Sequence, residues 1–453
     1  MKKHILLSLF ALLLSFSINA QANQTDNHNH DHSDHAGHDH SDHNHSKSDH
    51  SNKAHDAGAH HGDDHGHGGC GWHHHPEGQE YTPKDISAIA FHHISDANVY
   101  SIGPLQIPLP CILYAPETGW DVFLSSKFKF SKTGHGDGHS AYKGYILDAG
   151  AVKRITDPSF PRDVDEVPLM GITHKTEMVD GKEKTVAYAC TGDKEYRTDG
   201  KSIADAGIFG GGLSSFYDFS ITKNVTSMII VFLLMLWLFM KVAKSYVTRN
   251  GMAPKGLQSF MESIFVFIQD EVAKPFLGAK YLKYQPFLMA IFFFVLGLNL
   301  WGQIPFFGGA NVTGNIGVTM VLAIFAFLVV NLSGNKHYWE HIFLMPGVPK
   351  WVLTILSPVE FLGIFIKPLT LMLRLFANIT AGHMVIIVFV SLIFMFSKGG
   401  TSYAGGFGTA IGSTLLTIFM MAIELLVAFI QAFVFTILTA SYLGAAVEEP
   451  HHH

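Results

Sequence analysis

The sequence predicts an α-helical polytopic membrane protein of about five spans, with a mostly-β soluble domain before the first span. Three observations support this fold class. Charged residues make up only 15% of the 453 residues, against about 25% in soluble domains. The second half contains apolar runs long enough to cross a bilayer, whereas the first residues, up to position 79, are strongly polar. The formal net charge of −6 gives no sign of nucleic-acid binding.

Residues 1–22 have the pattern of a secretory signal peptide. Lys2 and Lys3 form the charged start, Ile5 to Phe16 is apolar, and Ala20-Gln21-Ala22 is a small-residue cleavage site. A retained short anchor is the alternative. In both cases we expect the segment that follows to be exported.

Residues 23–79 form a low-complexity, histidine-rich segment that we expect to be disordered. Seventeen of the 29 histidines lie between His28 and His75, and almost nothing apolar accompanies them. Neutral imidazole binds Zn, Cu or Ni, so His73, His74 and His75 are weak candidates for an unselective metal site. The alternative is a solvated, pH-responsive tether. No other metal or cofactor is expected.

Residues 80–215 are expected to form a small, mostly-β domain on the exported side. Short stretches rich in β-branched and aromatic residues lie between Gly, Pro and Asp, and Asp180-Gly181 is typical of a hairpin turn. The region has no recognisable catalytic or metal-binding motif. The expected strands are Gln106 to Ala115, Ala141 to Ala149, Ile172 to Val179 and Glu183 to Ala189.

The chain has three cysteines, Cys70, Cys111 and Cys190. An exported chain can hold a disulfide. Cys111 and Cys190 are the favoured pair because both lie on expected strands. Free buried thiols are the alternative.

Residues 222–449 are expected to form the membrane domain, after a Gly-rich linker that ends in interfacial aromatic residues. The last two apolar segments exceed one upright crossing, so they must tilt, lie partly flat or break, with Pro358 and Pro368 as the break points. We expect these two to form an antiparallel hairpin. A surface-lying amphipathic stretch is expected at about Leu257 to Phe276. The expected spans are about Asn224 to Val247, Gln285 to Ile304, Gly317 to Leu332, Lys350 to Phe396 and Gly408 to Leu443.

Loop charges predict the orientation. Lysines and an arginine cluster after the first span and in the 247–284 loop, and the loops expected outside carry almost no charge. The positive-inside rule then puts this loop and the C-terminus in the cytoplasm, with the N-terminal extension in the periplasm. The expected location is a bacterial inner membrane.

Arg374 is the most unusual residue of the membrane half. Apolar sequence extends over two turns on both sides of it, and no acidic residue lies within ten positions. A guanidinium at membrane depth is costly and cannot give up its proton, so it needs a carboxylate that its own segment does not supply. Five more polar residues stand out in the last two segments: Glu360, Asn378, His383, Glu424 and Gln431.

Helical spacing arranges these residues along the expected hairpin. If Arg374 is level with Gln431, His383 lies about 13 Å further along its helix, and Glu424 lies about 10 Å along the partner in the same direction. These two titratable groups then meet at similar depth, toward the periplasm. Glu360 lies on the opposite side of Arg374.

Two motifs in the last segments resemble subunit a of the F-type ATP synthases. They are Lys367-Pro368-Leu followed by Arg374-Leu-Phe-Ala-Asn378, and Gln431-Ala-Phe-Val-Phe. The resemblance covers roughly residues 222–449. It implies a non-catalytic stator subunit that passes protons through two offset half-channels to the carboxylates of a rotating c-ring, with Arg374 as the separating cation. The implied partners are the c-ring, subunit b and the remaining ATP synthase, in contact with membrane lipid.

Other readings of the same residues stay open. Asn378 and Gln431 could join helices by hydrogen bonds, Glu360 could be an interfacial carboxylate, and His383 could be a merely satisfied buried histidine. A secondary proton or metal transporter with a His-rich periplasmic segment is the alternative function. It is weakened because the membrane half has no inverted repeat. A membrane-anchored metal sensor would leave Arg374 unexplained.

Overall fold

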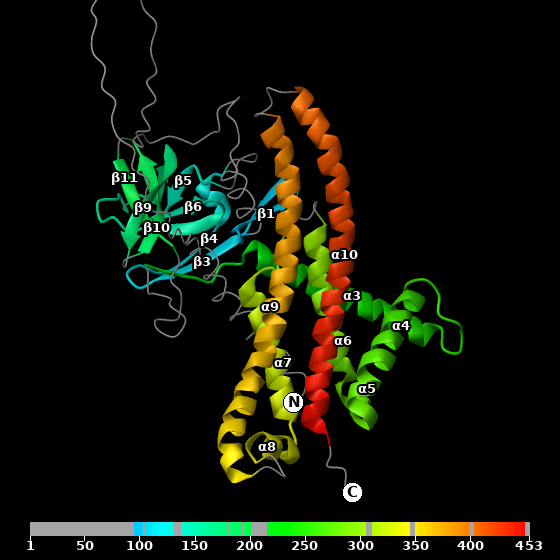
Figure 1. Cartoon of the computed structure of the whole chain (residues 1–453). Coiled ribbons are helices and arrows are strands. Elements are labelled where there is room, and N and C mark those ends of the chain that lie inside the picture. The colour runs from blue at the N-terminus through cyan, green and yellow to red at the C-terminus, as the bar shows by residue number, and fades with distance from the viewer. Residues whose placement is uncertain are drawn as a thin grey trace, which may run out of the picture.

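The computed structural model describes residues 95–102, 105–130, 137–162, 164–179, 182–192, 194–200, 215–304, 310–344, 349–397 and 403–448. The expected signal peptide, the His-rich segment with His73, His74 and His75, Cys70, and the Asp180-Gly181 turn lie outside the described residues. Within them, a β domain is followed by a bundle of long helices (Figure 1).

The β domain contains three antiparallel sheets, which confirms the mostly-β expectation. The largest has the strand order β8-β5-β6-β7-β11-β10-β9, a second has the order β12-β3-β4, and β1 pairs with β2. The strands are β1 (Val99–Ile102), β2 (Leu105–Pro108), β3 (Pro110–Ala115), β4 (Gly119–Leu124), β5 (Ser140–Tyr142), β6 (Tyr145–Asp148), β7 (Ala151–Ile155), β8 (Glu166–Pro168), β9 (Gly171–Val179), β10 (Lys182–Thr191), β11 (Lys194–Asp199) and β12 (Tyr217–Asp218).

Two of the four expected strands are each divided in two. Lys143 and Gly144 both have positive φ, 51° and 78°, which is the geometry of a two-residue hairpin turn. They separate β5 from β6. The other expected strand is interrupted at Leu109 between two prolines, which donate no ladder hydrogen bond.

The expected disulfide between Cys111 and Cys190 is wrong, because neither cysteine is in a disulfide and both are buried. Cys111 packs with Leu113 and Phe128 under the β12-β3-β4 sheet, whereas Cys190 lies on β10 of the large sheet, with its Sγ 3.9 Å from Thr173 Oγ1. The two thiols therefore lie in different sheets, and each is surrounded by its own neighbours. Burial raises the pKa of the Cys111 thiol to about 12.

The helical half contains five helices long and apolar enough to cross a membrane, within the part of the chain described, as expected. Figure 1 shows α9 and α10 side by side as an antiparallel hairpin, with α6 and α7 beside it. The helices are α3 (Lys223–Thr248), α4 (Leu257–Ile268), the π-helical turn η3 (Gln269–Ala273), α5 (Lys274–Leu277), α6 (Tyr281–Gln303), α7 (Ile316–Ser333), α8 (Lys336–Phe343), α9 (Lys350–Phe396) and α10 (Tyr403–Val447).

The hairpin helices differ from expectation at two points. Helix α9 continues through Pro358 and Pro368 without a break, because an internal proline removes one hydrogen bond and can bend a helix without ending it. Helix α10 begins at Tyr403, before the expected start of this span at about Gly408.

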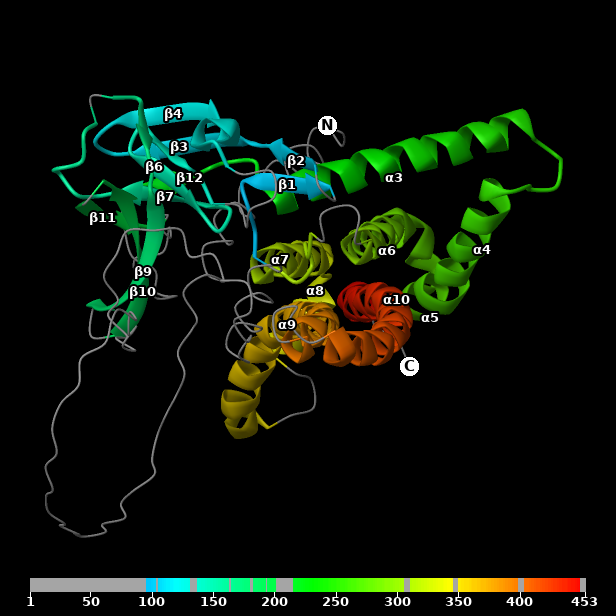
Figure 2. The ribbon, with the colours of Figure 1, turned by 90° about the horizontal axis from the view of Figure 1, so that it is seen from above.

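Length determines how this hairpin can sit in a bilayer. The 47 residues of α9 span about 70 Å at 1.5 Å per residue, against a hydrocarbon core of about 30 Å. The helix must therefore tilt strongly. Figure 2 shows that α3 lies across the direction of α6, α7, α9 and α10. If the α9–α10 hairpin is tilted close to the membrane plane, α3 is therefore close to the membrane normal.

The β domain is fixed to the start of α3 and to the end of α6. The indole Nε1–H of Trp301 donates to the Tyr100 hydroxyl at 3.3 Å, and the backbone N–H of Asn224 donates to Asp96 Oδ1 at 3.0 Å. We call the end of the bundle near these contacts the β-domain end, and the opposite end the α8 end.

Candidate functional site

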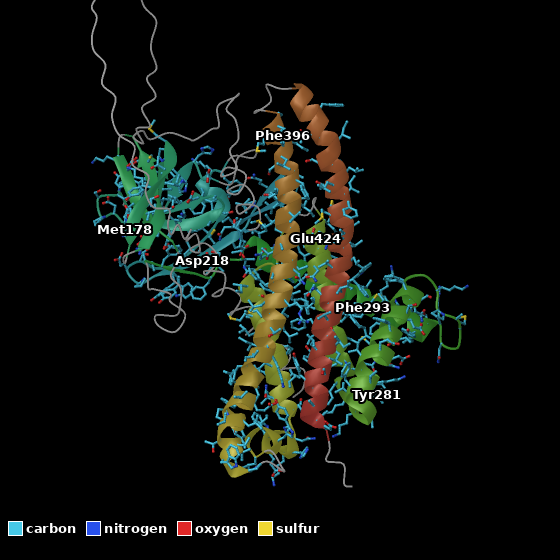
Figure 3. All side chains as sticks on the ribbon, viewed as in Figure 1. Met178, Asp218, Tyr281, Phe293, Phe396 and Glu424 are labelled. Atoms are coloured by element: carbon cyan, nitrogen blue, oxygen red, sulfur yellow. The ribbon has the colours of Figure 1, made fainter. Side chains whose placement is uncertain are left out.

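His383 and Glu424 meet between α9 and α10. Their Nδ1 and Oε1 atoms are 4.0 Å apart, and their side chains are 17% and 6% exposed. A Cβ atom at Gly382 would lie 3.3 Å from Glu424 Oε1, so this glycine lets the carboxylate approach the α9 backbone. The structure thus brings one acid and one base together, and Figure 3 shows Glu424 where the two helices adjoin.

Two side-chain amides on α6, the half-buried Gln303 and the buried Asn299, hold the α10 segment that carries Glu424. Gln303 Nε2 donates to the backbone carbonyl of Glu424 at 2.8 Å, and Asn299 Nδ2 donates to the carbonyl of Ala428 at 3.1 Å. The donors are one helical turn apart, as are the acceptors. This amide ladder fixes the rotation of α10 and therefore the direction in which Glu424 points.

Arg374 and Asn378 lie on a different surface, the exposed side of α9. Both side chains are exposed, together with the small residues Ala377 and Ala381 between and beyond them. No hydrogen bond or ion pair joins Arg374 to any described residue. Gln431, in contrast, is buried, with 6% exposure. Gln431 and Arg374 therefore differ in exposure, although both are polar residues of the hairpin.

Glu360 lies among polar groups at the α8 end. Tyr338 of α8 donates from its hydroxyl to Asn331 Oδ1 at 3.2 Å. Burial, and secondarily the Glu360 carboxylate, raise the pKa of this tyrosine. Lys367 Nζ lies 5.4 Å from the centre of the Tyr442 ring, and a pocket is lined in part by Asn331, Tyr338, Lys367 and Tyr442.

The α6–α7 connection adds buried polar groups that the sequence analysis did not single out. Asn311, Thr313 and Asn315 are almost fully buried, and the hydroxyl of Thr380, one turn before His383, donates to the Gly314 carbonyl at 3.3 Å. The sequence signal that could have identified these residues, and Gln303, is the presence of polar side chains next to apolar spans.

The described residues contain no group of three or more His, Cys, Asp or Glu side chains that could hold a metal ion. Their polar chemistry in the helical half is that of hydrogen bonds and titratable groups.

Comparison with known proteins matches the two parts of the chain separately. The family model described as ATP synthase A chain matches residues 225–444, and a domain of unknown function (DUF8433) matches residues 89–180. The chain is 41% identical over 241 residues to ATP synthase subunit a of Chloroherpeton thalassium, covering 52% of this chain and 69% of that protein.

Further relatives agree. ATP synthase subunit a 2 of Prosthecochloris aestuarii is 38% identical over 242 residues, covering 52% of this chain and 71% of the relative. Subunit a of Chlorobium phaeobacteroides is 38% identical over 242 residues, with 52% and 68% covered. The chain therefore belongs to the family of ATP synthase subunit a, the non-catalytic, proton-translocating stator subunit of F-type ATP synthases.

Proposed function

We propose that Arg374 separates two offset half-channels and attracts the carboxylates of a rotating c-ring. The observation that carries this proposal is the exposure of Arg374 on an apolar helix, without a counter-ion among the described residues. A guanidinium at membrane depth is costly unless it is paired. The small, exposed residues Ala377 and Ala381 allow a neighbouring helix to approach closely.

The charge of Arg374 supplies both attraction and release. An ionised ring carboxylate is attracted to the guanidinium, and a protonated one is released, because only the charged form has a strong electrostatic interaction with it. The same fixed charge opposes direct passage of protons between the half-channels. Arginine is suited to this role because it stays protonated.

Titratable groups lie on both sides of Arg374. His383 is nine residues further along α9, about 13 Å, and Glu360 is fourteen residues before it, about 21 Å. We assign the His383–Glu424 pair, 4.0 Å apart, to the half-channel at the β-domain end. Glu360, with Lys367 and Tyr338 near it, belongs to the half-channel at the α8 end.

We infer the orientation from the positive charges after α3. These charges favour the cytoplasm, which leaves the β domain in the periplasm and the C-terminus in the cytoplasm of a bacterial inner membrane. Residues 1–22 then serve as the signal peptide, residues 23–79 as an exported His-rich segment, residues 80–215 as the periplasmic domain and residues 222–449 as the membrane domain. The c-ring and subunit b are the proposed partners within the complex.

Cross-linking tests the surface assigned to the ring. In the assembled complex, Asn378→Cys should form a disulfide with a cysteine placed next to the ring carboxylate. Gln431→Cys is the matched control, because Gln431 is also polar but buried. Absence of an adduct with Asn378→Cys, or equal adducts at both positions, would contradict the assignment.

A further inference from the structure

We infer that the outer face of the β12-β3-β4 sheet lies in the lipid interface and seats the β domain on the bilayer beside α3. We call this surface the apolar face. Residues alternate across a strand, so every second residue of these strands points to it. Its three rows are Tyr217-Tyr114-Trp120, Phe219-Ile112-Val122 and Ile221-Pro110-Leu124.

All nine residues of the apolar face are apolar or aromatic. Trp120 is 61% exposed, Val122 is 67% exposed and Leu124 is 49% exposed. A sheet face that meets water normally carries polar side chains, and a contiguous exposed apolar surface marks a contact with a partner or a membrane. The inward residues of the same strands, such as Cys111 and Leu113, fill the domain core.

The large sheet of the same domain shows what a water-facing surface of this protein carries. There Arg197 pairs with Glu177 at 3.1 Å, and Lys175 pairs with Glu195. The charged pairs leave only isolated exposed apolar residues, such as Met178. The strands of the large sheet thus carry exposed ion pairs that the nine residues of the apolar face cannot form.

Continuity with the helical half identifies lipid as the occupant. The ladder continues past β12, since Phe219 N–H donates to the Ile112 carbonyl at 2.8 Å and Ile221 N–H donates to the Pro110 carbonyl at 3.1 Å. Ile221 packs against the core of the helical half, and α3 begins two residues later. Figure 1 shows β3 along the lower edge of the β domain.

The order of the rows fits the composition of a membrane interface. The row nearest α3 is aliphatic, and the row furthest from it is aromatic, with ring centroids of Tyr114 and Trp120 5.0 Å apart. Tyrosine and tryptophan favour the headgroup level because one end of each ring system is apolar and the other polar. Val122 lies one row, about 7 Å, from the level of Ile221, which is about the thickness of one headgroup layer. The aromatic row lies two rows, about 14 Å, from that level, on the water side of the same layer.

Fluorescence quenching in the whole ATP synthase tests this inference. The complex, carrying Cys70→Ser, is reconstituted into nanodiscs of phosphatidylcholine and phosphatidylglycerol, with or without phosphatidylcholine doxyl-labelled near the headgroup. Val122→Cys is labelled with bimane. The buried Cys111 and Cys190 do not react. Met178→Cys is the matched control, because Met178 is also 67% exposed and lies on the side of the domain away from the helices (Figure 3).

We expect doxyl lipid to quench the label at position 122 several-fold more than the label at position 178, and aqueous iodide to show the reverse. Equal quenching by iodide at both positions would mean that water covers the apolar face. Protection from both quenchers at position 122 would mean that a protein covers it. Either result overturns the inference. Leu124→Cys provides a second position on the same face if Val122→Cys does not assemble.

Discussion

The charged side chains of the β domain contrast with Arg374, the exposed charge in the middle of α9. In the β domain they pair locally: Asp121 with Lys143 at 2.9 Å, and Asp148 with Lys153 at 2.7 Å. In the hairpin, Arg374 is exposed and has no ion pair with a described residue. The β domain thus pairs these charged side chains with one another. The helical half leaves Arg374, its energetically most costly charge, without an ion pair to a described residue.

This difference is informative because the free-energy benefit of pairing a charge is small in water and large in hydrocarbon. An exposed ion pair in water contributes little to stability, whereas an unpaired charge in hydrocarbon costs from a few to more than ten kcal/mol. In the proposed function, a carboxylate of the c-ring supplies this counter-charge to Arg374.

Replacing Arg374 should have the largest effect. We expect Arg374→Ala to lower ATP-driven proton pumping by at least about 100-fold, the loss that corresponds to about 3 kcal/mol of electrostatic stabilisation. Pumping into inverted vesicles measures this. Arg197→Ala, which breaks the Glu177 pair in the β domain, is the control and should leave pumping near wild type. Coupled pumping by Arg374→Ala would refute the role assigned to the guanidinium.

Exchange of the buried acid and base should have the next largest effect. We expect His383→Glu and Glu424→His each to lower pumping by about 10-fold to 100-fold, because each leaves two like groups 4.0 Å apart. The double variant restores one acid and one base, so it should regain most of the activity. Equal loss in the single and double variants would show that the two groups act independently.

Loss of one rung of the amide ladder should have a smaller effect. Gln303→Leu removes the donor to the Glu424 carbonyl, and a hydrogen bond of this kind contributes about 1 kcal/mol. We expect about a fivefold lower pumping rate and a shifted pH of half-maximal pumping, because Glu424 is less firmly oriented toward His383.

Gln285→Leu is the matched control for Gln303→Leu. Gln285 is also on α6, but its amide donates to Gln269 at 3.0 Å. The control should keep the wild-type pH profile. If both variants shift the pH of half-maximal pumping equally, the amide ladder does not orient Glu424.

The sequence predicted what depends on one helix at a time. The bounds of α9 agree with the apolar run from Lys350 to Phe396, because a continuous apolar segment is visible without knowledge of the fold. The proximity of His383 to Glu424 followed from helical spacing once the two segments were taken as antiparallel. The rise per residue is regular enough for that step.

The sequence did not predict what depends on how elements pack. The burial of Gln431, which is 6% exposed, is one such feature, since the rotation of a helix is set by its neighbours. The Gln303–Glu424 contact spans 121 positions, and no local pattern encodes it. The Cys111–Cys190 pairing failed for the same reason, because strand propensity does not say which sheet a strand joins.

The smallest predicted effect concerns pH and the ion pairs of the β domain. His174 Nε2 lies 3.1 Å from Asp148 Oδ2, and this hydrogen bond raises the pKa of His174 above 6.5. Burial of Asp148 opposes its ionisation, but Lys153 and His174 together hold the pKa of this carboxyl below its usual 3.8. The histidine stabilises the fold fully below pH 6.5 and loses its contribution as the pH rises through its folded-state pKa. The aspartate contributes above pH 3.8 and loses its contribution as the pH falls through its own folded-state pKa.

Both contributions are therefore present between pH 3.8 and 6.5. Because the His174 side chain is 46% exposed, solvent screening reduces its contribution to well under about 1 kcal/mol. We expect His174→Gln to speed hydrogen exchange in β6 and β9 of the intact complex a few-fold at about pH 5.5, and less at about pH 8.5, after correction for intrinsic rates. His139→Gln, at an exposed histidine of the same domain, should change neither. A larger effect of His174→Gln at the higher pH would reverse the sign of the coupling, and would place the stabilising proton on a group other than His174.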